Sequence, residues 1–258
     1  MSTPESAPWE SVRVLNLRVD AVTEEDVISH VLSWVDEPGP ARLAVGVNAH
    51  ACNQAARDLQ LRTRMCAADL AYADGQSVVW AARLLGVRVP ERVATTDFIH
   101  PLVDRAAAAG HRIFLYGGQP GVAERAAARL VERTPAARID AHHGYVAANQ
   151  IDDVIARINE FGTDILFVGL GDPLQQQWVD TYRSRLKVSA MLTCGGLFDV
   201  VSGRIARPPR WMARAGLEWL GRLFIDPGHV ARRYLLGNPA FIARLARQYV
   251  RGRRIRSS

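Results

Sequence analysis

The sequence predicts an α/β fold in two parts. Residues 1–202 are expected to form a Rossmann-like, mostly parallel sheet with helices on both faces, and residues 203–258 an appendage of helices rich in arginine and tryptophan. The first prediction rests on short apolar runs that alternate with amphipathic segments at the spacing of β-α units. The second rests on a change of composition after Ser202, where Pro208 and Pro209 introduce a basic segment.

The two parts carry opposite charge. From Gly203 onwards there are thirteen arginines and two acidic residues, a net charge of +11, which leaves 19 basic and 24 acidic residues, a net charge of −5, in residues 1–202. Lys187 is the only lysine, so arginine content by itself says little. Its concentration at one end of the chain, however, predicts an anionic partner for the appendage.

The first third of the chain contains two β-α units. Residues 12–19 alternate between apolar and polar and predict a strand, and residues 23–37 predict a helix with Thr23 as its N-cap. Residues 41–50 form an apolar strand that ends in a small polar turn, and a helix is expected to follow through about Leu61.

The middle of the chain continues the alternation. Residues 69–75 predict a short strand that ends in Asp-Gly, residues 77–86 the helix after it, and residues 98–110 another helix. Residues 111–133 form the clearest strand–loop–helix unit, with a five-residue apolar run, two glycines and a long amphipathic helix.

The body ends with three more strands. Residues 137–146 predict a short strand, and a helix follows around 150–161. Residues 164–186 repeat the strand, glycine loop and helix, and residues 188–196 form the last strand before a Gly-Gly turn. Strands and helices that alternate in this way indicate a mostly parallel sheet.

Cysteine usage and hydropathy indicate a cytoplasmic protein. Cys52, Cys66 and Cys194 are odd in number and far apart, which fits buried thiols in a reducing compartment better than disulfides or zinc ligands. The N-terminus lacks a basic region followed by an apolar run, and no segment reaches the roughly 18 consecutive apolar residues of a membrane span. We therefore expect any membrane contact to be peripheral.

Polar residues and glycines follow several predicted strands, at the edge where an open parallel sheet binds ligands. They are Asn48, Asp74, Gly117, Gly118, residues 169–172, Gly195 and Gly196. Glycine turns before helices bring backbone N–H groups close to phosphate, which predicts a nucleotide or sugar-nucleotide cleft. Alternatively, these glycines only close tight βα turns. Neither GxGxxG nor GxxxxGK[ST] is present, so dinucleotide and P-loop sites are not predicted.

Asp74 is the candidate general base, because it follows a strand directly and could take a proton from an attacking hydroxyl. The alternative is a helix N-cap or an Asp-Gly turn, and Asp97 has the same alternative. His142 and His143 lack carboxylate or cysteine partners at metal-ligand spacing, so a solvated loop is expected there.

Seven blocks of sequence together resemble one family. They are NAHACNQA (48–55), ADGQSVVWAARLLG (73–86), ERVATTDF (91–98), FLYGGQPGVAERAAARL (114–130), GLGDPLQQQW (169–178), GGLFDVVSGRIARPPRWMARAGLEWLGRLFIDP (195–227) and RRY (232–234). In their order and spacing the chain resembles the WecG/TagA/CpsF glycosyltransferases over roughly residues 12–236. The resemblance implies an inverting, metal-independent hexosyltransferase of cell-surface polysaccharide biosynthesis, with Asp74 as the catalytic base. Such enzymes move N-acetylmannosamine or a related sugar from UDP to an undecaprenyl-diphosphate-linked sugar.

The resemblance also implies the substrate-binding residues and the partners. The residues that match, or that lie in the basic segments expected to hold a diphosphate, are Asn48, Arg92, Asp97, Gly117, Gly118, Gly171, Gln175, Gly195, Gly196, Arg207, Arg210, Trp211, Arg232 and Arg233. The expected partners are a UDP-sugar, a polyprenyl-diphosphate-linked acceptor and an anionic membrane surface, without nucleic acid, metal or other cofactor.

Four positions depart from the family pattern. Gly46 stands where the family usually has threonine and His50 where it has glutamate, while Leu174 and Gln176 replace a lysine and a glutamate. The loss of a charged pair from a sugar-nucleotide loop predicts a donor other than N-acetylmannosamine, such as a glucose-like sugar or a uronic acid.

The appendage combines arginines with aromatic residues suited to a membrane interface. At about 1 kcal/mol per basic residue near an anionic leaflet, four engaged arginines would contribute about 4 kcal/mol. We therefore expect peripheral docking on the inner face of the cell membrane, whereas a solvated basic helix is the favoured interpretation of residues 251–256. A nucleic-acid-binding tail is the main alternative, but it leaves Asp74 unexplained. A nicotinamide-dependent oxidoreductase is a weaker alternative, because the glycine motif that binds the dinucleotide is missing from the sequence.

Overall fold

The computed structural model describes residues 9–37, 39–209, 211–212, 216–225 and 227–256. Its centre is a six-stranded sheet in the order β4-β3-β8-β7-β5-β6, in which every neighbouring pair is parallel. The strands are β3 (Arg42–Val47), β4 (Leu70–Ala73), β5 (Arg112–Gly117), β6 (Arg138–His142), β7 (Ile165–Gly169) and β8 (Ala190–Thr193). The predicted α/β class is confirmed.

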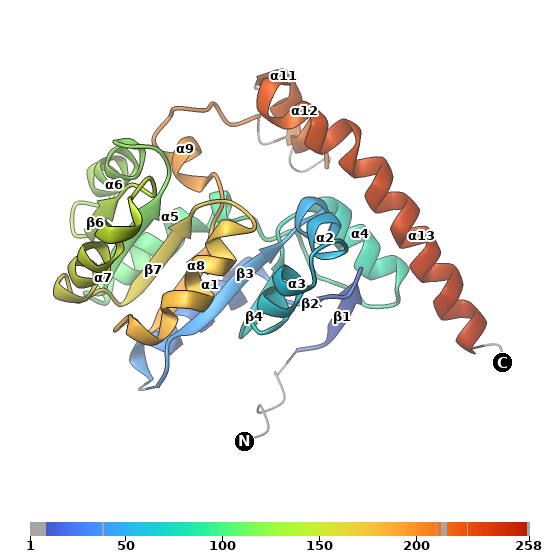
Figure 1. Ribbon diagram of the computed structural model, residues 1–258, viewed down its shortest axis with the longest axis horizontal. Coiled ribbons are helices and arrows are strands. Elements are labelled where there is room, and N and C mark those ends of the chain that lie inside the picture. The colour runs from blue at the N-terminus through green and yellow to red at the C-terminus, as the bar shows by residue number, and fades with distance from the viewer. Residues whose placement is uncertain (1–8, 38, 210, 213–215, 226, 257–258) are drawn as a thin grey trace.

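Helices cover both faces of this sheet (Figure 1). On one face lie α1 (Glu24–Asp36), α5 (Thr95–Ala108), α6 (Val122–Arg133) and the short α9 (Leu197–Val201). On the other lie α2 (Ala49–Ala55), α3 (Leu59–Cys66), α4 (Gln76–Leu84), α7 (Ile151–Glu160) and α8 (Leu174–Tyr182). Strands β4, β7 and β8 are buried at every position, which explains why they appear in the sequence as continuous apolar runs.

Two predicted elements are divided in the structure. Residues 12–19 form an antiparallel hairpin of β1 (Ser11–Val14) and β2 (Leu17–Asp20), separate from the main sheet, and its turn places Leu15 and Asn16 at φ of 48° and 72°. A left-handed leucine is rare, so the alternating pattern gave no sign of this turn. The helix expected through Leu61 is split because the Asp58 side chain accepts from the backbone N of Leu61 and starts α3.

The predicted N-cap of the first helix is confirmed. The hydroxyl oxygen of Thr23 accepts from the backbone N of Asp26, and the Asp26 carboxylate in turn accepts from the backbone N of Thr23. This reciprocal arrangement satisfies two N–H groups at the start of α1. Three acidic residues in the first turn also complement the helix dipole.

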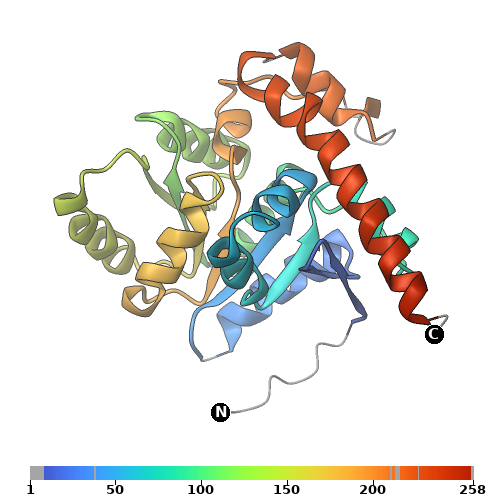
Figure 2. The ribbon, with the colours of Figure 1, turned by 45° about the vertical axis from the view of Figure 1, so that its right-hand side comes forward.

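The described part of the appendage contains α11 (Glu218–Ile225), α12 (Pro227–Leu235) and the long α13 (Gly237–Arg256), so its predicted helical character is confirmed. Figures 1 and 2 show α13 lying along one side of the body, beside α2 and α4. The Asn53 amide donates to the carbonyl of Gly237 over 2.7 Å. The Gln248 side chain accepts from the backbone N of Leu15 and donates to the carbonyl of Arg13, so α13 holds the β1–β2 turn.

Within the described ranges, no helix is both long enough and apolar enough to cross a membrane.

Candidate active site

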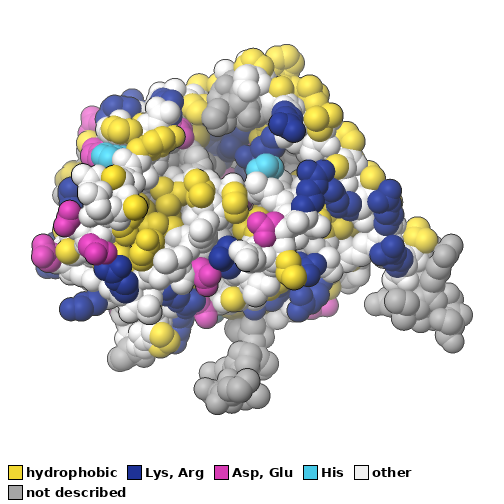
Figure 3. All heavy atoms as spheres, in the orientation of Figure 1, with side chains coloured by type: hydrophobic (Ala, Val, Ile, Leu, Met, Phe, Trp, Pro, Cys, Tyr) yellow, Lys and Arg dark blue, Asp and Glu magenta, His cyan; other side chains and the backbone are white. Residues whose placement is uncertain are grey.

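A cleft of about 1990 Å³ opens at the carboxyl ends of the strands. Its floor contains residues at or just after the ends of five strands: Gly46 of β3, Asp74 after β4, Tyr116 of β5, Gly169 of β7 and Thr193 of β8. The opposite wall comes from the appendage, and Figure 3 shows the molecule hollowed between these two parts, with basic side chains on the wall. The cleft therefore lies where a parallel sheet binds its ligands.

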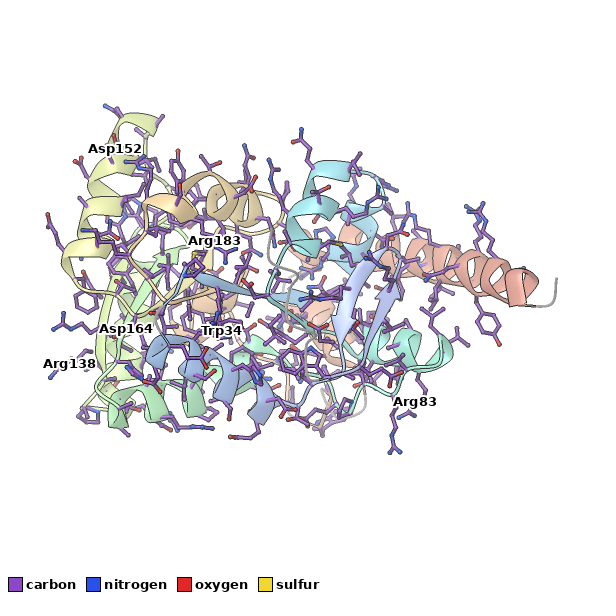
Figure 4. The ribbon with its side chains drawn as sticks, turned by 90° about the horizontal axis from the view of Figure 1, so that it is seen from below. Trp34, Arg83, Arg138, Asp152, Asp164 and Arg183 are labelled. Carbon is purple, nitrogen blue, oxygen red and sulfur yellow. The ribbon has the colours of Figure 1, made fainter. Side chains whose placement is uncertain are left out.

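The opposite end of the sheet is tied together by charged side chains and is structural (Figure 4). Arg183 donates to the carbonyl of Ala41 and pairs with Asp69 over 3.0 Å. Asp164 accepts from the backbone N of Arg112 over 2.7 Å. These bonds join the segments that lead into β3, β4, β5 and β7, and their charged groups are used within the protein.

Asp74 and Asn48 lie side by side on the floor of the cleft. The Asn48 carbonyl oxygen accepts from the backbone N of His50 and of Ala51, both at 3.0 Å, which caps α2. Its amide nitrogen lies 3.5 Å from Asp74 Oδ2 and donates to it. The N-cap of α4 is Gly75, which makes no side-chain cap, so Asp74 does not cap this helix. Asp74 instead lines the cleft.

Burial raises the pKa of Asp74 to about 6. The guanidinium groups of Arg222 and Arg92 and the amide of Asn48 act in the opposite sense and lower it, while the carboxylate of Glu218 raises it further. The group is therefore mostly ionised at pH 7 and still basic enough to accept a proton. A pKa close to the working pH is the property that a general base needs.

Gly46 allows Asp74 to lie against β3. A Cβ atom at position 46 would come within 2.9 Å of Asp74 Cβ and 3.1 Å of the Tyr72 ring. Protein Cβ atoms essentially never come as close as 2.9 Å to another atom, so a side chain here would displace Asp74 or the backbone that carries it. The position where the sequence departs from the threonine pattern thus directly controls where the candidate base sits.

The glycine turns divide into two kinds. Gly118, Gly171, Gly195 and Gly196 line the cleft. Gly117 does not, and a Cβ there would collide with the backbone of Gly169, so it permits close packing between β5 and β7. This second role is the turn-closing alternative that the sequence left open.

Two of the N–H groups that the turns offer to phosphate are used within the protein. The backbone N of Gly118 donates to the carbonyl of Gly169, and the backbone N of Gly195 donates to Gln175 Oε1, both over 3.0 Å. The buried Gln175 also donates to Asp172 Oδ1 over 2.7 Å. Gln175 therefore joins the loop after β7 to the turn after β8, and it shapes the cleft between them.

A chain of alternating charges joins the body to the appendage. Arg92 contacts Asp97 over 2.7 Å and Glu218 over 2.9 Å. Glu218 also pairs with Arg222 over 2.7 Å, and Asp97 also pairs with Arg207. Arg92 and Asp97 belong to the body, whereas the other three belong to the appendage. We call these five residues the ion-pair ladder.

The ion-pair ladder changes the interpretation of three predicted substrate-binding residues. Arg92 and Arg207 line the cleft, but Asp97 does not, and the structure binds all three to other members of the ladder. Glu218 and Arg222 line the cleft and were not among the predicted site residues. Their spacing of four residues within the GLEWLGRL segment, which places them on one helix face, was the available signal.

The other predicted residues of the appendage are distributed unevenly. Arg233 on α12 lines the cleft, whereas Arg232 and Trp211 do not, and Arg210 lies outside the described residues. His50 also lines the cleft, and burial together with the charge of Arg233 lowers the pKa of His50, so its ring is neutral at pH 7.

Among the residues that the structure describes, no three His, Cys, Asp or Glu side chains are grouped so that they could hold a metal ion. The rings of His142 and His143 are in contact, with centroids 4.5 Å apart and planes tilted by 37°. The Nδ1 atom of His142 lies 2.8 Å from the carbonyl of His143.

The comparison with protein families covers both parts of the molecule. The model described as the glycosyl transferase WecG/TagA/CpsF family matches residues 12–255 of the 258. The match begins in the β1–β2 hairpin and ends in α13, so it includes the sheet, the cleft and the appendage.

Proposed function

The chain belongs to the WecG/TagA/CpsF family of glycosyltransferases, and on this premise we propose that it transfers a hexose from a UDP-sugar to a polyprenyl-diphosphate-linked sugar in cell-surface polysaccharide synthesis. The observation that carries the proposal is the Asp74 carboxylate, which lies on the cleft floor with a pKa of about 6 and with arginines nearby. A base beside an arginine-lined wall fits a reaction that removes one proton and releases a diphosphate.

In the proposed reaction Asp74 accepts the proton of the acceptor hydroxyl. The hydroxyl oxygen bonds to the anomeric carbon of the donor while the bond from that carbon to the UDP oxygen breaks, which inverts the configuration. Negative charge develops on the departing diphosphate, and the arginines that line the cleft, Arg92, Arg207, Arg222 and Arg233, are placed to stabilise it. The proton stays on Asp74 until it is lost to solvent.

We propose that this transfer needs no metal ion. Guanidinium groups bind phosphate oxygens bidentately and keep their charge at every working pH, so several arginines can neutralise a diphosphate. In the ion-pair ladder three arginines share two carboxylates, which leaves one positive charge in excess. Arg233 adds another, since no carboxylate among the described residues pairs with it.

The donor sugar is proposed to differ from N-acetylmannosamine. Three of the four departures from the family pattern, at Gly46, His50 and Leu174, line the cleft. Gln176 is buried and does not line it, so the change at this position bears on packing and not on the donor. A neutral imidazole and an exposed leucine in place of charged groups would favour a sugar with different polar substituents.

We also propose that the appendage docks on an anionic membrane surface. Trp211, Phe224 and Leu236 are exposed and do not line the cleft, and arginines lie between them in the sequence. Exposed apolar side chains among basic residues are typical of helices that bind the membrane interface.

The experiment that tests the function is UDP release from a panel of UDP-sugars, with and without a short-chain polyprenyl-diphosphate sugar acceptor. We expect release that depends on the acceptor and that is strong with one donor. Release at the same rate without acceptor would indicate a hydrolase, and no release from any UDP-sugar would contradict the proposal.

A further inference from the structure

One wall of the cleft is apolar and exposed. On α4, Trp80 is 54% exposed and Leu84 is 47% exposed, and both line the cleft. The appendage contributes the exposed side chains of Trp219, Ile225 and Ile242 to the same cleft. Helix α13 runs along the side of the body on which α4 lies, and it passes in front of α4 in Figure 2 (Figures 1 and 2). We call the space lined by these five residues the apolar groove.

The apolar groove leads away from the candidate base. Helix α4 begins directly after Gly75, and Trp80 and Leu84 lie one and two turns along it from Gln76. At the rise of an α-helix, Leu84 is about 12 Å from the start of the helix. The appendage touches this helix, because a Cβ on Gly216 would come within 2.9 Å of the Trp80 ring. The groove therefore has the catalytic floor at one end and solvent at the other.

The two ends of the groove differ in chemistry. The charges of Arg92 and Arg222 act on Asp74, whereas the residues of the apolar groove carry indole and aliphatic side chains. Exposed apolar side chains that gather in a concave site usually mark a binding surface. The arrangement matches a molecule with an anionic head and a hydrocarbon chain.

We propose that the apolar groove binds the first isoprene units of the lipid acceptor, next to its diphosphate. This inference rests on the proposed function, and it assigns recognition of the hydrocarbon to the body helix α4 as well as to the appendage. Contact with the bilayer is assigned to other residues. Phe224 and Leu236 are exposed outside the cleft, and we assign them to the membrane surface.

The test measures the binding of isopentenyl, geranyl and farnesyl diphosphate to the full-length protein by isothermal titration calorimetry, without vesicles and below micelle-forming concentrations. Burial of added methylene groups favours binding, so Kd should fall at least about tenfold from the five-carbon to the fifteen-carbon chain. Trp80→Ala and Leu84→Ala should flatten this dependence. Leu59→Ala is the matched control, because Leu59 is 63% exposed on α3 and does not line the cleft.

A Kd that does not change with chain length would overturn the proposal, as would equal flattening by Leu59→Ala. A wild-type dimer that Trp80→Ala dissociates would identify a second copy of the chain as the occupant and would also overturn it. Binding needs no donor, so these outcomes are independent of the UDP-release experiment. Binding that depends on chain length, without transfer from any UDP-sugar, would support the assignment of the groove and contradict the proposed function.

Discussion

At the residue scale, Asp74 combines burial, which raises its pKa, with an arginine-rich neighbourhood, which lowers it. The balance leaves a carboxylate that is ionised at neutral pH and faces the cleft. Asn48 links this group to the start of α2, so the base is held by a side chain that is itself fixed as a helix cap.

We expect Asp74→Asn to keep donor binding and to lower turnover at least about 10²-fold, as is typical for the loss of a general base. Initial rates and donor titration would separate the two quantities. Asp180→Asn, which changes an exposed carboxylate on α8 outside the cleft, should keep turnover. If the turnover of Asp74→Asn stayed within a few-fold of the wild-type value, another residue would have to act as the base.

The pH dependence of Asp74 has a defined sign. Since its pKa rises from 3.8 to about 6 on folding, kcat/KM should fall as pH drops through about 6. The folded state binds this proton more tightly than the unfolded chain does, so the ionised group opposes folding above pH 6 and not below pH 4. Asp74→Asn should therefore raise Tm at pH 7.5, with a gain that shrinks towards pH 4. A lower Tm at pH 7.5 would mean that the carboxylate stabilises the fold.

Position 46 should also affect turnover, through the placement of the base. Gly46→Ala adds a Cβ that must displace Asp74 or Tyr72, so we expect kcat to fall at least about tenfold, by analogy with the loss of catalytic positioning. Gly39→Ala is the matched control, since a Cβ there meets nothing within 4 Å. Full activity of Gly46→Ala would show that the base tolerates movement.

At the scale of elements, the ion-pair ladder connects the first turn of α5 to α11. Its charged groups are half-buried, and Arg207 and Arg222 each pair with one carboxylate of the ladder, so removing Asp97 or Glu218 leaves one arginine without its ladder partner. Breaking a buried pair costs more than an exposed one for this reason. The ladder also sets the charge around Asp74, because Glu218 raises the pKa of that carboxyl and Arg222 lowers it.

We expect substitutions of Glu218 and Arg222, which pair on α11, to shift the pH profile in opposite directions. Glu218→Gln removes a group that raises the pKa of Asp74, so the acid limb of the kcat/KM profile should move to lower pH. Arg222→Gln removes a cation that lowers this pKa and should move the limb to higher pH. Full pH profiles of both variants provide the measurement. Shifts in the same direction would contradict the assignment of the limb to Asp74.

At the scale of the whole molecule, the appendage has two kinds of apolar surface. One lines the cleft together with α4, and the other, which includes Phe224 and Leu236, is exposed outside it. The body is acidic and the appendage strongly basic, so an anionic surface would attract the appendage and not the body.

The double variant Phe224→Ser with Leu236→Ser should reduce flotation with anionic vesicles severalfold, because it removes two exposed apolar contacts. Leu59→Ser, a similar change on the body, should float as the wild type does. Raised salt should weaken binding of all variants, since exposed charges are screened. Tight, salt-dependent binding to nucleic acid without vesicle binding would contradict the docking proposal. It would favour a nucleic-acid-binding role for the basic appendage.

The sequence by itself determined the parallel sheet, the helices on both faces and the helical appendage, because hydrophobic periodicity and glycine turns are local properties of the chain. It also placed Asn48 and Asp74 after predicted strands, at the edge of the sheet where ligands bind. Thr23 was identifiable as a helix cap for the same local reason.

The tertiary structure decided which of these residues meet. The β1–β2 turn is held by Gln248, more than 200 positions later in the chain, and the partners of Arg92 and Asp97 come partly from the appendage. The close approach of Gly46 to Asp74 depends on the pairing of β3 with β4. Charge pairing, burial and steric contact between distant segments depend on three-dimensional distance, and a local pattern in one sequence carries no information about that distance.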